Sequence, residues 1–232
     1  MKYKQYQKMK DSGVEWIGEI PEHWEVRRLK FVFDIIKNGV WGSEPSENNS
    51  NLICVRVADF NRNNSTVSLE NRTLRNIPKN QEEKCLLENG DLLLERSGGG
   101  EKQPVGFTVI YNHDENAVCS NFITRLKPKD EFDSSFLNYI FSSMYYNTQN
   151  VKYIKQTTGI QNLDLKYLSQ NFFFPLYEEQ KQISEFLDAQ GTHFDNQISK
   201  YQSQIKLLQE KRQVLIADTV TGKIDIRNGV VA

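Results

Sequence analysis

The stretch LYEEQKQISEFLDAQGTHFDNQISKYQSQIKLLQEKRQVLIADTV (176–220) decides how this chain is organised. It contains no proline and a single glycine, Gly191, and it stops just short of Gly222, a residue that can adopt the left-handed conformation that ends helices. Two glutamates lie in its first turn, and Lys211 and Arg212 lie near its end, as the helix dipole favours. The stretch predicts one helix of about 40 residues, roughly 60 Å long.

Apolar or long side chains recur along this helix in steps of three and four residues. Such a repeat is a heptad seam, which is the contact face of a coiled coil. One extra residue near Phe194 interrupts the repeat and locally relaxes the supercoil. We assign the following positions to an interface with a second helix: Ile183, Leu187, Gln190, Phe194, Ile198, Tyr201, Ile205, Leu208, Arg212 and Leu215.

A helix of this length is too long to bury its whole seam against the domain that precedes it. Isolated helices also gain little stability from the propensities of their residues. We therefore predict an intermolecular coiled coil with a helix from a second chain. The alternative is a helix that folds back along its own domain.

Residues 1–175 combine two patterns. Apolar residues between Ser134 and Tyr146 fall at helical spacing. Short runs rich in strand-forming residues are separated by turn clusters, and these runs are 52–57, 92–94, 105–111 and 122–126. Neither a strict alternation of strands and helices nor an internal repeat is visible. We predict an α+β fold with a mixed globular domain over 1–175, a long spacer helix over 176–220 and a C-terminal tail over 221–232.

The composition is that of a globular protein with balanced charge. The 232 residues include 29 Lys and Arg against 30 Asp and Glu, so net charge neither supports nor excludes nucleic-acid binding. No run approaches the roughly 20 apolar residues of a membrane span, and the polar N-terminus lacks the apolar segment of a secretory signal. Three cysteines form neither a metal-binding pair nor an even disulfide set. We expect a cytoplasmic protein with reduced thiols.

Motifs for catalysis are missing from the sequence. Asp91 and Glu95 flank a run of leucines, but no lysine follows where a metal-dependent nuclease motif places one. The glycines at 98–100 are not followed by the lysine and hydroxyl residue of a phosphate-binding loop. The three histidines share no spacing typical of a metal site or catalytic triad. We predict no catalytic centre, no metal site and no cofactor held by this chain.

The segment NLICVRVADFNRNN (51–64) carries side chains suited to reading DNA bases. Arginine contacts guanine through two hydrogen bonds, and asparagine contacts adenine in the same way. We expect the first arginine to lie on a strand and the later polar residues to lie in a loop. The alternative is a polar turn that uses its asparagines for left-handed conformations. The candidate DNA-contacting residues here are Arg56, Asn61, Arg62 and Asn63.

Two further segments combine glycine with small polar and basic side chains. They are SGGGEKQP (97–104), which Arg96 precedes, and VKYIKQTTGIQNLD (151–164). Hydroxyls, amides and glycine allow a backbone to approach a phosphate closely. The alternatives are a glycine turn at a strand edge for the first segment and a helix-capping loop for the second. The candidate DNA-contacting residues here are Arg96, Ser97, Lys102, Gln103, Lys155, Thr157, Thr158, Gln161 and Asn162.

Five segments taken together are more specific than any one motif. In chain order they are SGVEWIGEIPEHWEV (12–26), GDLLLERSGGG (90–100), TTGIQNLD (157–164), PLYEEQKQISEFLD (175–188) and LLQEKRQVLIADTVTGKID (207–225). This combination resembles the specificity subunit of type I restriction-modification enzymes. The resemblance runs in the expected order over nearly the whole chain.

The resemblance implies a non-catalytic protein that reads double-stranded DNA. In this family each target-recognition domain contacts one half of a bipartite target, and two helices pack antiparallel and hold the domains apart. Methyltransferase subunits that carry S-adenosylmethionine dock on this frame, and a motor-nuclease subunit joins them. Family members usually have two recognition domains and two conserved helical regions, whereas this sequence has one of each. We expect a half-sized subunit that pairs with a second copy or with another half subunit.

Two other functions remain open at this point. One is a self-sufficient methyltransferase or nuclease, against which the missing motifs argue. The other is a coiled-coil adaptor or decoy subunit that binds the methyltransferase without reading DNA. The recognition domain is the variable part of the family, so the resemblance predicts neither the target sequence nor the gap between its halves.

Overall fold

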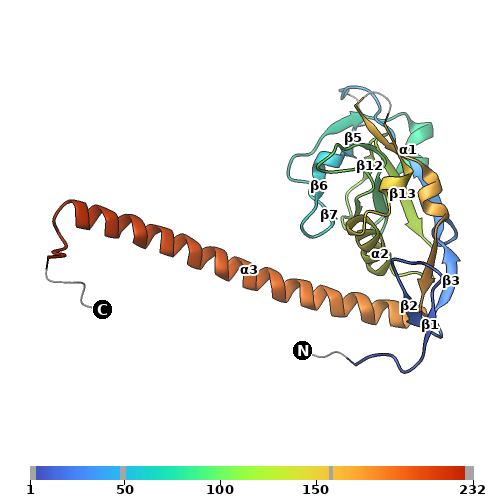
Figure 1. The fold of residues 1–232 in the computed structure, drawn as a ribbon. Coiled ribbons are helices and arrows are strands. Elements are labelled where there is room, and N and C mark those ends of the chain that lie inside the picture. Colours follow the sequence, from blue (N-terminus) through green and yellow to red (C-terminus); the bar gives the residue numbers. More distant parts are fainter. Residues whose placement is uncertain (1–3, 48–50, 157–158, 228–232) are drawn as a thin grey trace. The chain divides into compact units, whose positions relative to one another are not determined.

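The computed structural model describes residues 4–47, 51–156 and 159–227. The chain divides into two compact units, and the boundary lies between Ser184 and Glu185. We call the first unit the head. The second unit contains most of the long C-terminal helix (Figure 1). The predicted α+β fold is confirmed.

A six-stranded sheet forms the centre of the head. All neighbouring strands are antiparallel except β11 and β7, which are parallel. The longest strands pair with a clear register, in which Thr124 of β13 lies opposite Asn38 on one side and Leu94 on the other. In sheet order the strands are β4 (Phe33–Asn38), β13 (Ile123–Pro128), β9 (Leu92–Glu95), β11 (Thr108–Ile110), β7 (Thr66–Val67) and β6 (Phe60–Asn61).

The leucines of β9 are buried on both faces of this sheet. Leu92 and Leu94 belong to one apolar cluster and Leu93 belongs to another, because successive side chains of a strand point to opposite faces. The apolar face of α2 (Ser134–Tyr146) covers the first cluster. The second cluster includes residues of β5 and β12 from a neighbouring sheet. The central sheet is therefore enclosed on both sides.

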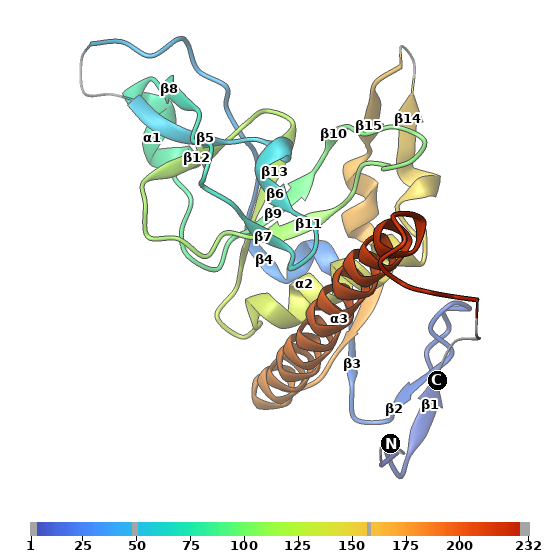
Figure 2. The same ribbon diagram turned by 90° about the vertical axis from the view of Figure 1, so that its left-hand side faces the viewer.

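Among the described residues, four smaller sheets complete the head. One, in the order β12 (Ala117–Cys119), β5 (Asn51–Val55) and β8 (Leu74–Asn76), lies next to α1 (Lys79–Cys85) (Figure 2). Another, in the order β10 (Ser97–Gly98), β15 (Gln161–Leu163) and β14 (Ile154–Gln156), lies apart from it in the same view. Two pairs remain, β16 (Asn171–Phe174) with β3 (Glu25–Arg28) and β1 (Met9–Asp11) with β2 (Glu19–Pro21).

The predicted long helix is confirmed as α3 (Tyr177–Val220), which has 44 residues. Among the described residues of α3, none is buried after Ser184. Gly222 follows the helix with a φ of 76°, the left-handed conformation expected of a terminating glycine. The head extends to Ser184, beyond the boundary expected at 175, because the first two turns of α3 contact it.

The structure also bears on thiols and membrane spans. Cys54, Cys85 and Cys119 are buried in the head as free thiols. Burial raises the pKa of Cys54 to about 11 and also raises the pKa of Cys119. Within the described ranges, no helix is both long and apolar enough to cross a bilayer.

Candidate functional site

A cleft of about 980 Å³ opens in the head beside the glycine-rich loop. One wall is the segment from Val57 to Arg62, which contains a short 3₁₀ helix and β6. The other wall is the loop 99–103, which follows β10. Glu95, at the end of β9, lines the cleft between them. Three of the predicted DNA-contacting residues, Arg62, Lys102 and Gln103, therefore line one cavity.

Arg62 is held in this cleft by two neighbours. Its Nη2 donates a hydrogen bond to Glu95 Oε2 at 2.6 Å, and its guanidinium lies over the ring of Phe107, 4.5 Å from the centroid. The Glu95 residue is only 1% exposed. Burial raises the pKa of Glu95 above its ordinary value, and the charge of Arg62 opposes that rise. The arginine is thus fixed by an ion pair and a cation–π contact.

The glycine-rich loop has a conformation that requires glycine at one position. Gly99 has a φ of 58°, and a Cβ built there would lie 2.8 Å from the backbone nitrogen of Val105. That same nitrogen donates to Gln161 Oε1 at 3.2 Å. Gly100 N donates to the Gln103 carbonyl at 2.9 Å, which closes the turn. Lys102 and Gln103 are exposed at its tip.

The small sheet beside the loop gathers four more predicted residues. Ser97 lies opposite Asn162, and Asn162 lies opposite Lys155 on the third strand. Ser97 Oγ donates to Asn162 Oδ1 at 2.7 Å. Lys155 is exposed and its Nζ donates to Asp164 Oδ2 at 2.6 Å, while Gln161 is buried. Because Gln161 also contacts the loop at Val105, the sheet and the cleft wall adjoin.

The sequence predicted that Arg56 lies on a strand, and this prediction is wrong. Arg56 caps the 3₁₀ helix Val57–Asp59, and its backbone and guanidinium nitrogens donate to the Asp59 carboxylate at 2.7–3.2 Å. The strand β5 ends one residue earlier, at Val55, because this capping exchange stops its extension. Arg56 therefore serves the local fold through Asp59.

The remaining candidates have mixed placements. Asn61 lies in β6, and its side chain accepts a hydrogen bond from the backbone of Asn63 at 3.1 Å, which closes a polar turn. The left-handed residue of this turn is Ser65, with a φ of 54°, and not one of the asparagines for which the alternative predicted it. Arg96 is half-buried, and within the described part of the chain its Nε has no hydrogen-bond partner. Thr157 and Thr158 lie outside the described residues.

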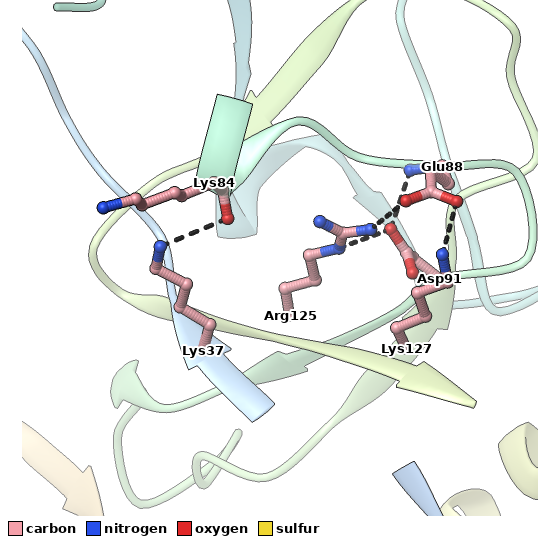
Figure 3. A network of polar contacts seen from close by, with 6 residues as sticks. All are labelled: Lys37, Lys84, Glu88, Asp91, Arg125 and Lys127. Atoms are coloured by element: carbon pink, nitrogen blue, oxygen red, sulfur yellow. Dashed lines mark hydrogen bonds and ion pairs between the residues drawn. The ribbon is translucent and has the colours of Figure 1, made fainter. Parts of the chain in front are cut away.

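A second charged cluster lies at the other end of β9, where Asp91 directly precedes the strand. Arg125 of β13 donates to Asp91 at 2.6 Å and to Glu88 at 2.9 Å, and Lys127 donates to Glu88 at 2.6 Å (Figure 3). Lys37 donates to the carbonyl of Lys84 near the end of α1, where a cation complements the helix dipole. The two carboxylates considered for a metal, Asp91 and Glu95, are thus bound to two different arginines. In the described ranges no group of three possible ligands for a metal occurs.

Sequence reasoning missed two residues that shape the cleft. Glu95 was considered only as a metal ligand, and Phe107 was not singled out. Neither the pairing of Arg62 with Glu95 nor its contact with Phe107 has a local signal, because the partners are 33 and 45 positions away. Only the buried run before Glu95 hinted that its carboxylate would need a cation.

The chain is similar to known proteins both in sequence and in fold. A family model described as the type I restriction modification DNA specificity domain matches residues 21–209. The MjaVIII specificity subunit of a type I restriction enzyme from Methanocaldococcus jannaschii is 27% identical over 219 residues, which cover 91% of this chain and 49% of that protein. The chain spans about half the length of the curated relatives it matches.

Solved structures share the fold at lower identity. A chain from a structure of the type I R-M system has a TM-score of 0.57 at 18% identity, with 86% of this chain and 46% of that chain covered. The HsdS subunit from Thermoanaerobacter tengcongensis has a TM-score of 0.50 at 20% identity, with 81% and 42% covered. These likenesses show a shared fold over four fifths or more of this chain.

Proposed function

Because the chain belongs to the family of type I restriction-modification DNA specificity domains, we propose that it reads one half of a bipartite DNA target. The curated relatives are specificity subunits of restriction enzymes, so the proposed role is to select a site and not to catalyse a reaction. We propose that the protein acts in the cytoplasm, because its proposed partner is the cell's DNA.

The observation that carries this proposal is the arrangement of Arg62. Its guanidinium is oriented by Glu95 and by the ring of Phe107 at the mouth of an open cleft. An arginine fixed in this way loses little conformational freedom when it forms paired hydrogen bonds to a guanine. Lys102 and Lys155 are exposed on the adjoining loop and sheet, where they are suited to contact phosphates.

The second half of the proposed target requires a second reader, and α3 is suited to recruit it. The seam residues after Ser184 are exposed or half-exposed, which leaves them available to another helix. Residues 177–198 contain five acidic residues and one basic residue, whereas 199–220 contain four basic and two acidic residues. Antiparallel pairing of two copies would place opposite charges together, and parallel pairing would place acid beside acid.

Ile183 leaves the proposed seam. It packs against the apolar cluster of the head and so has an intramolecular partner. The proposed interface therefore starts at Leu187 and continues through Leu215. Its partner is a second copy or another half subunit.

The other proposed partners are the methyltransferase subunits, which would supply S-adenosylmethionine, and the motor-nuclease subunit. The chain itself would hold no cofactor. A coiled-coil adaptor that binds the methyltransferase without reading DNA is the competing function. The two functions differ in one respect, which is whether the chain changes the set of methylated sites.

The test is sequencing of methylated sites in cells that carry the chain together with its methyltransferase partner, compared with cells that lack the chain. A reader yields a defined motif, and Arg62→Ala changes the preference at one position of it, since a good arginine–guanine pair contributes about 1–3 kcal/mol of discrimination. Arg72→Ala is the matched control, because Arg72 is an exposed arginine bound to Glu115 outside the cleft. A methylation pattern that does not depend on the chain would refute DNA reading and support an adaptor.

A further inference from the structure

The glycine-rich loop of the cleft ends at a residue that two buried amides hold in place. The backbone nitrogen of Val105 donates to Gln161 Oε1 at 3.2 Å, and its carbonyl accepts from Asn150 Nδ2 at 2.7 Å. All three residues are buried. Because a buried polar group that loses its partner is costly, these two hydrogen bonds resist any shift of the backbone at Val105.

The residues on either side of this anchor are fixed as well. The ring of Pro104 restricts its φ, and its carbonyl accepts from Tyr145 Oη at 3.1 Å. On the other side, Gly106 N donates to the carbonyl of Glu95 at 2.9 Å. The carboxylate of Glu95 also binds Arg62. The end of the loop is therefore tied to the same residue that orients the arginine in the cleft.

Gln103 lies directly before the anchored segment. Its carbonyl accepts from Gly100 N at 2.9 Å, so the turn restrains its backbone from the other side. Its side chain is exposed, lines the same cleft as Arg62, and makes no hydrogen bond to any other described residue. A glutamine amide presents one donor and one acceptor side by side, which match N7 and the N6 amino group of adenine.

We propose that Gln103 is a specificity-determining residue that reads an adenine of the half-site, and that Gln161 and Asn150 are positioning residues that hold its loop. This inference rests on the proposed function and adds a second base to the one read by Arg62. A side chain on a backbone that is already fixed loses less conformational freedom on binding, which strengthens recognition. Gln161 thus supports the reading residue and does not touch DNA itself.

Lys102, the residue before Gln103, is suited to a different contact. It is also exposed in the loop. Its ammonium is a point charge that lacks the paired donor and acceptor of an amide, so it fits a phosphate better than the edge of an adenine. Phosphate contacts position a protein on DNA but carry no sequence information directly. Two adjacent residues of one turn therefore make a general contact and a base-specific contact.

The experiment sequences methylated sites in cells that carry the full chain and its methyltransferase partner. Gln103→Ala is expected to reduce the preference for adenine about 5- to 150-fold at one motif position other than the modified base. The position that Arg62→Ala changes should keep its preference. Lys102→Ala is the matched control from the same loop, and it is expected to lower methylation at all sites alike without changing the motif.

The positioning role has its own variant. Gln161→Met retains the approximate volume of the side chain but removes the acceptor of Val105 N. It is expected to reduce the adenine preference about two- to tenfold, at the same motif position as Gln103→Ala. Combined with Gln103→Ala, it should cause no further loss at that position, because the loop then has no reading amide to hold.

Gln149→Met is the matched control for the positioning variant. The side chain of Gln149 bonds to Asn147 and Lys152 and not to the loop. The same substitution there is expected to leave the preference at every motif position unchanged. Tryptophan fluorescence checks that the head remains folded in each variant.

The outcomes separate this inference from the proposed function. A wild-type chain that directs no defined motif refutes the proposed function itself. A defined motif that Gln103→Ala leaves unchanged, or changes at a base other than adenine, overturns adenine reading and leaves the proposed function standing. If Gln161→Met weakened all positions alike, including the one read by Arg62, its role would be general folding and the positioning role would be overturned.

Discussion

The head and the exposed part of α3 use the same apolar residue types in opposite ways. Leu93 in the central strand is 0% exposed, whereas Leu208 in the helix is 66% exposed. The head covers both faces of its sheet with its own elements. In α3 after Ser184, none of the described residues is buried. The difference teaches that the head buries its apolar residues by itself, whereas the seam of α3 would be buried only in the proposed pairing with a second helix.

Physical estimates support this contrast. Burying a leucine or isoleucine side chain contributes about 1.5–3 kcal/mol. The head obtains this contribution within one chain, so its unfolding should not depend on protein concentration. In the proposed pairing the seam of α3 obtains it by association, so the stability of the helix should rise with protein concentration. Because Trp16, Trp24 and Trp41 all lie in the head, tryptophan fluorescence reports on the head alone.

The largest expected effect concerns the buried ion pair between Arg125 of β13 and Asp91. Arg125→Met is expected to lower the free energy of unfolding of the head by about 3–5 kcal/mol, because it leaves the buried Asp91 without its cation. Urea unfolding followed by fluorescence measures the loss. Arg72→Met removes an exposed pair and should cost at most about 1 kcal/mol. Equal losses in the two variants would contradict the special role of the buried pair.

The second effect concerns α3. Ile198→Lys is expected to weaken self-association at least about tenfold, since one buried side chain contributes 1.5–3 kcal/mol and 1.4 kcal/mol corresponds to tenfold. Ser199→Lys adds the same charge one position along, on a different face, and should leave association nearly unchanged. Sedimentation equilibrium measures both. If the unmodified chain were monomeric at all concentrations, the seam would have no partner in a second copy of this chain.

A smaller effect is expected at the cleft. Gly99→Ala should cost about 1–2 kcal/mol, because a side chain is disfavoured at positive φ and its Cβ would approach Val105. Gly100→Ala is the control, since a Cβ there meets nothing within 4 Å. Unfolding midpoints and binding to the methylation motif would be measured together. If Gly100→Ala were the more harmful of the two, the described loop conformation would be wrong.

The smallest expected effect lies in the middle of α3. Gly191→Ala should stabilise the helix by about 0.5–1 kcal/mol, because glycine is the poorer helix former and a Cβ there meets nothing within 4 Å. Circular dichroism at 222 nm measures the gain. The head, followed by fluorescence, should not change. A loss of association in this variant would instead place a second helix close to Gly191.

The sequence predicted the boundaries of the helices better than it predicted what each helix packs against. The helices at 134–146 and 176–220 agree with the structure within a residue, because each has a long uninterrupted period and clear end signals. Ile183 fits the heptad as well as Leu187 does, yet it packs on the head. A helical repeat defines a face but does not identify what covers it.

Only part of the candidate site could be predicted from the sequence, and the reason is similar. Residue type alone selected Arg56 and Arg62 equally, but Asp59 engages the first and the cleft contains the second. Elsewhere in the head, the hydrogen bonds of Glu179 with Tyr6, His23 and Trp24 likewise span more than 150 positions. Such long-range pairings are set by tertiary packing, which composition and periodicity do not encode position by position.

The sheltered sulfur atoms of Cys54, Cys85 and Cys119 have a practical consequence. An alkylating reagent attacks the thiolate; all three groups are buried, and burial also raises the pKa of the Cys54 and Cys119 thiols, which disfavours their ionisation. Labelling can proceed only when β5, β12 or α1 transiently opens. The rate of native alkylation therefore reports local opening in that corner of the protein without any introduced probe.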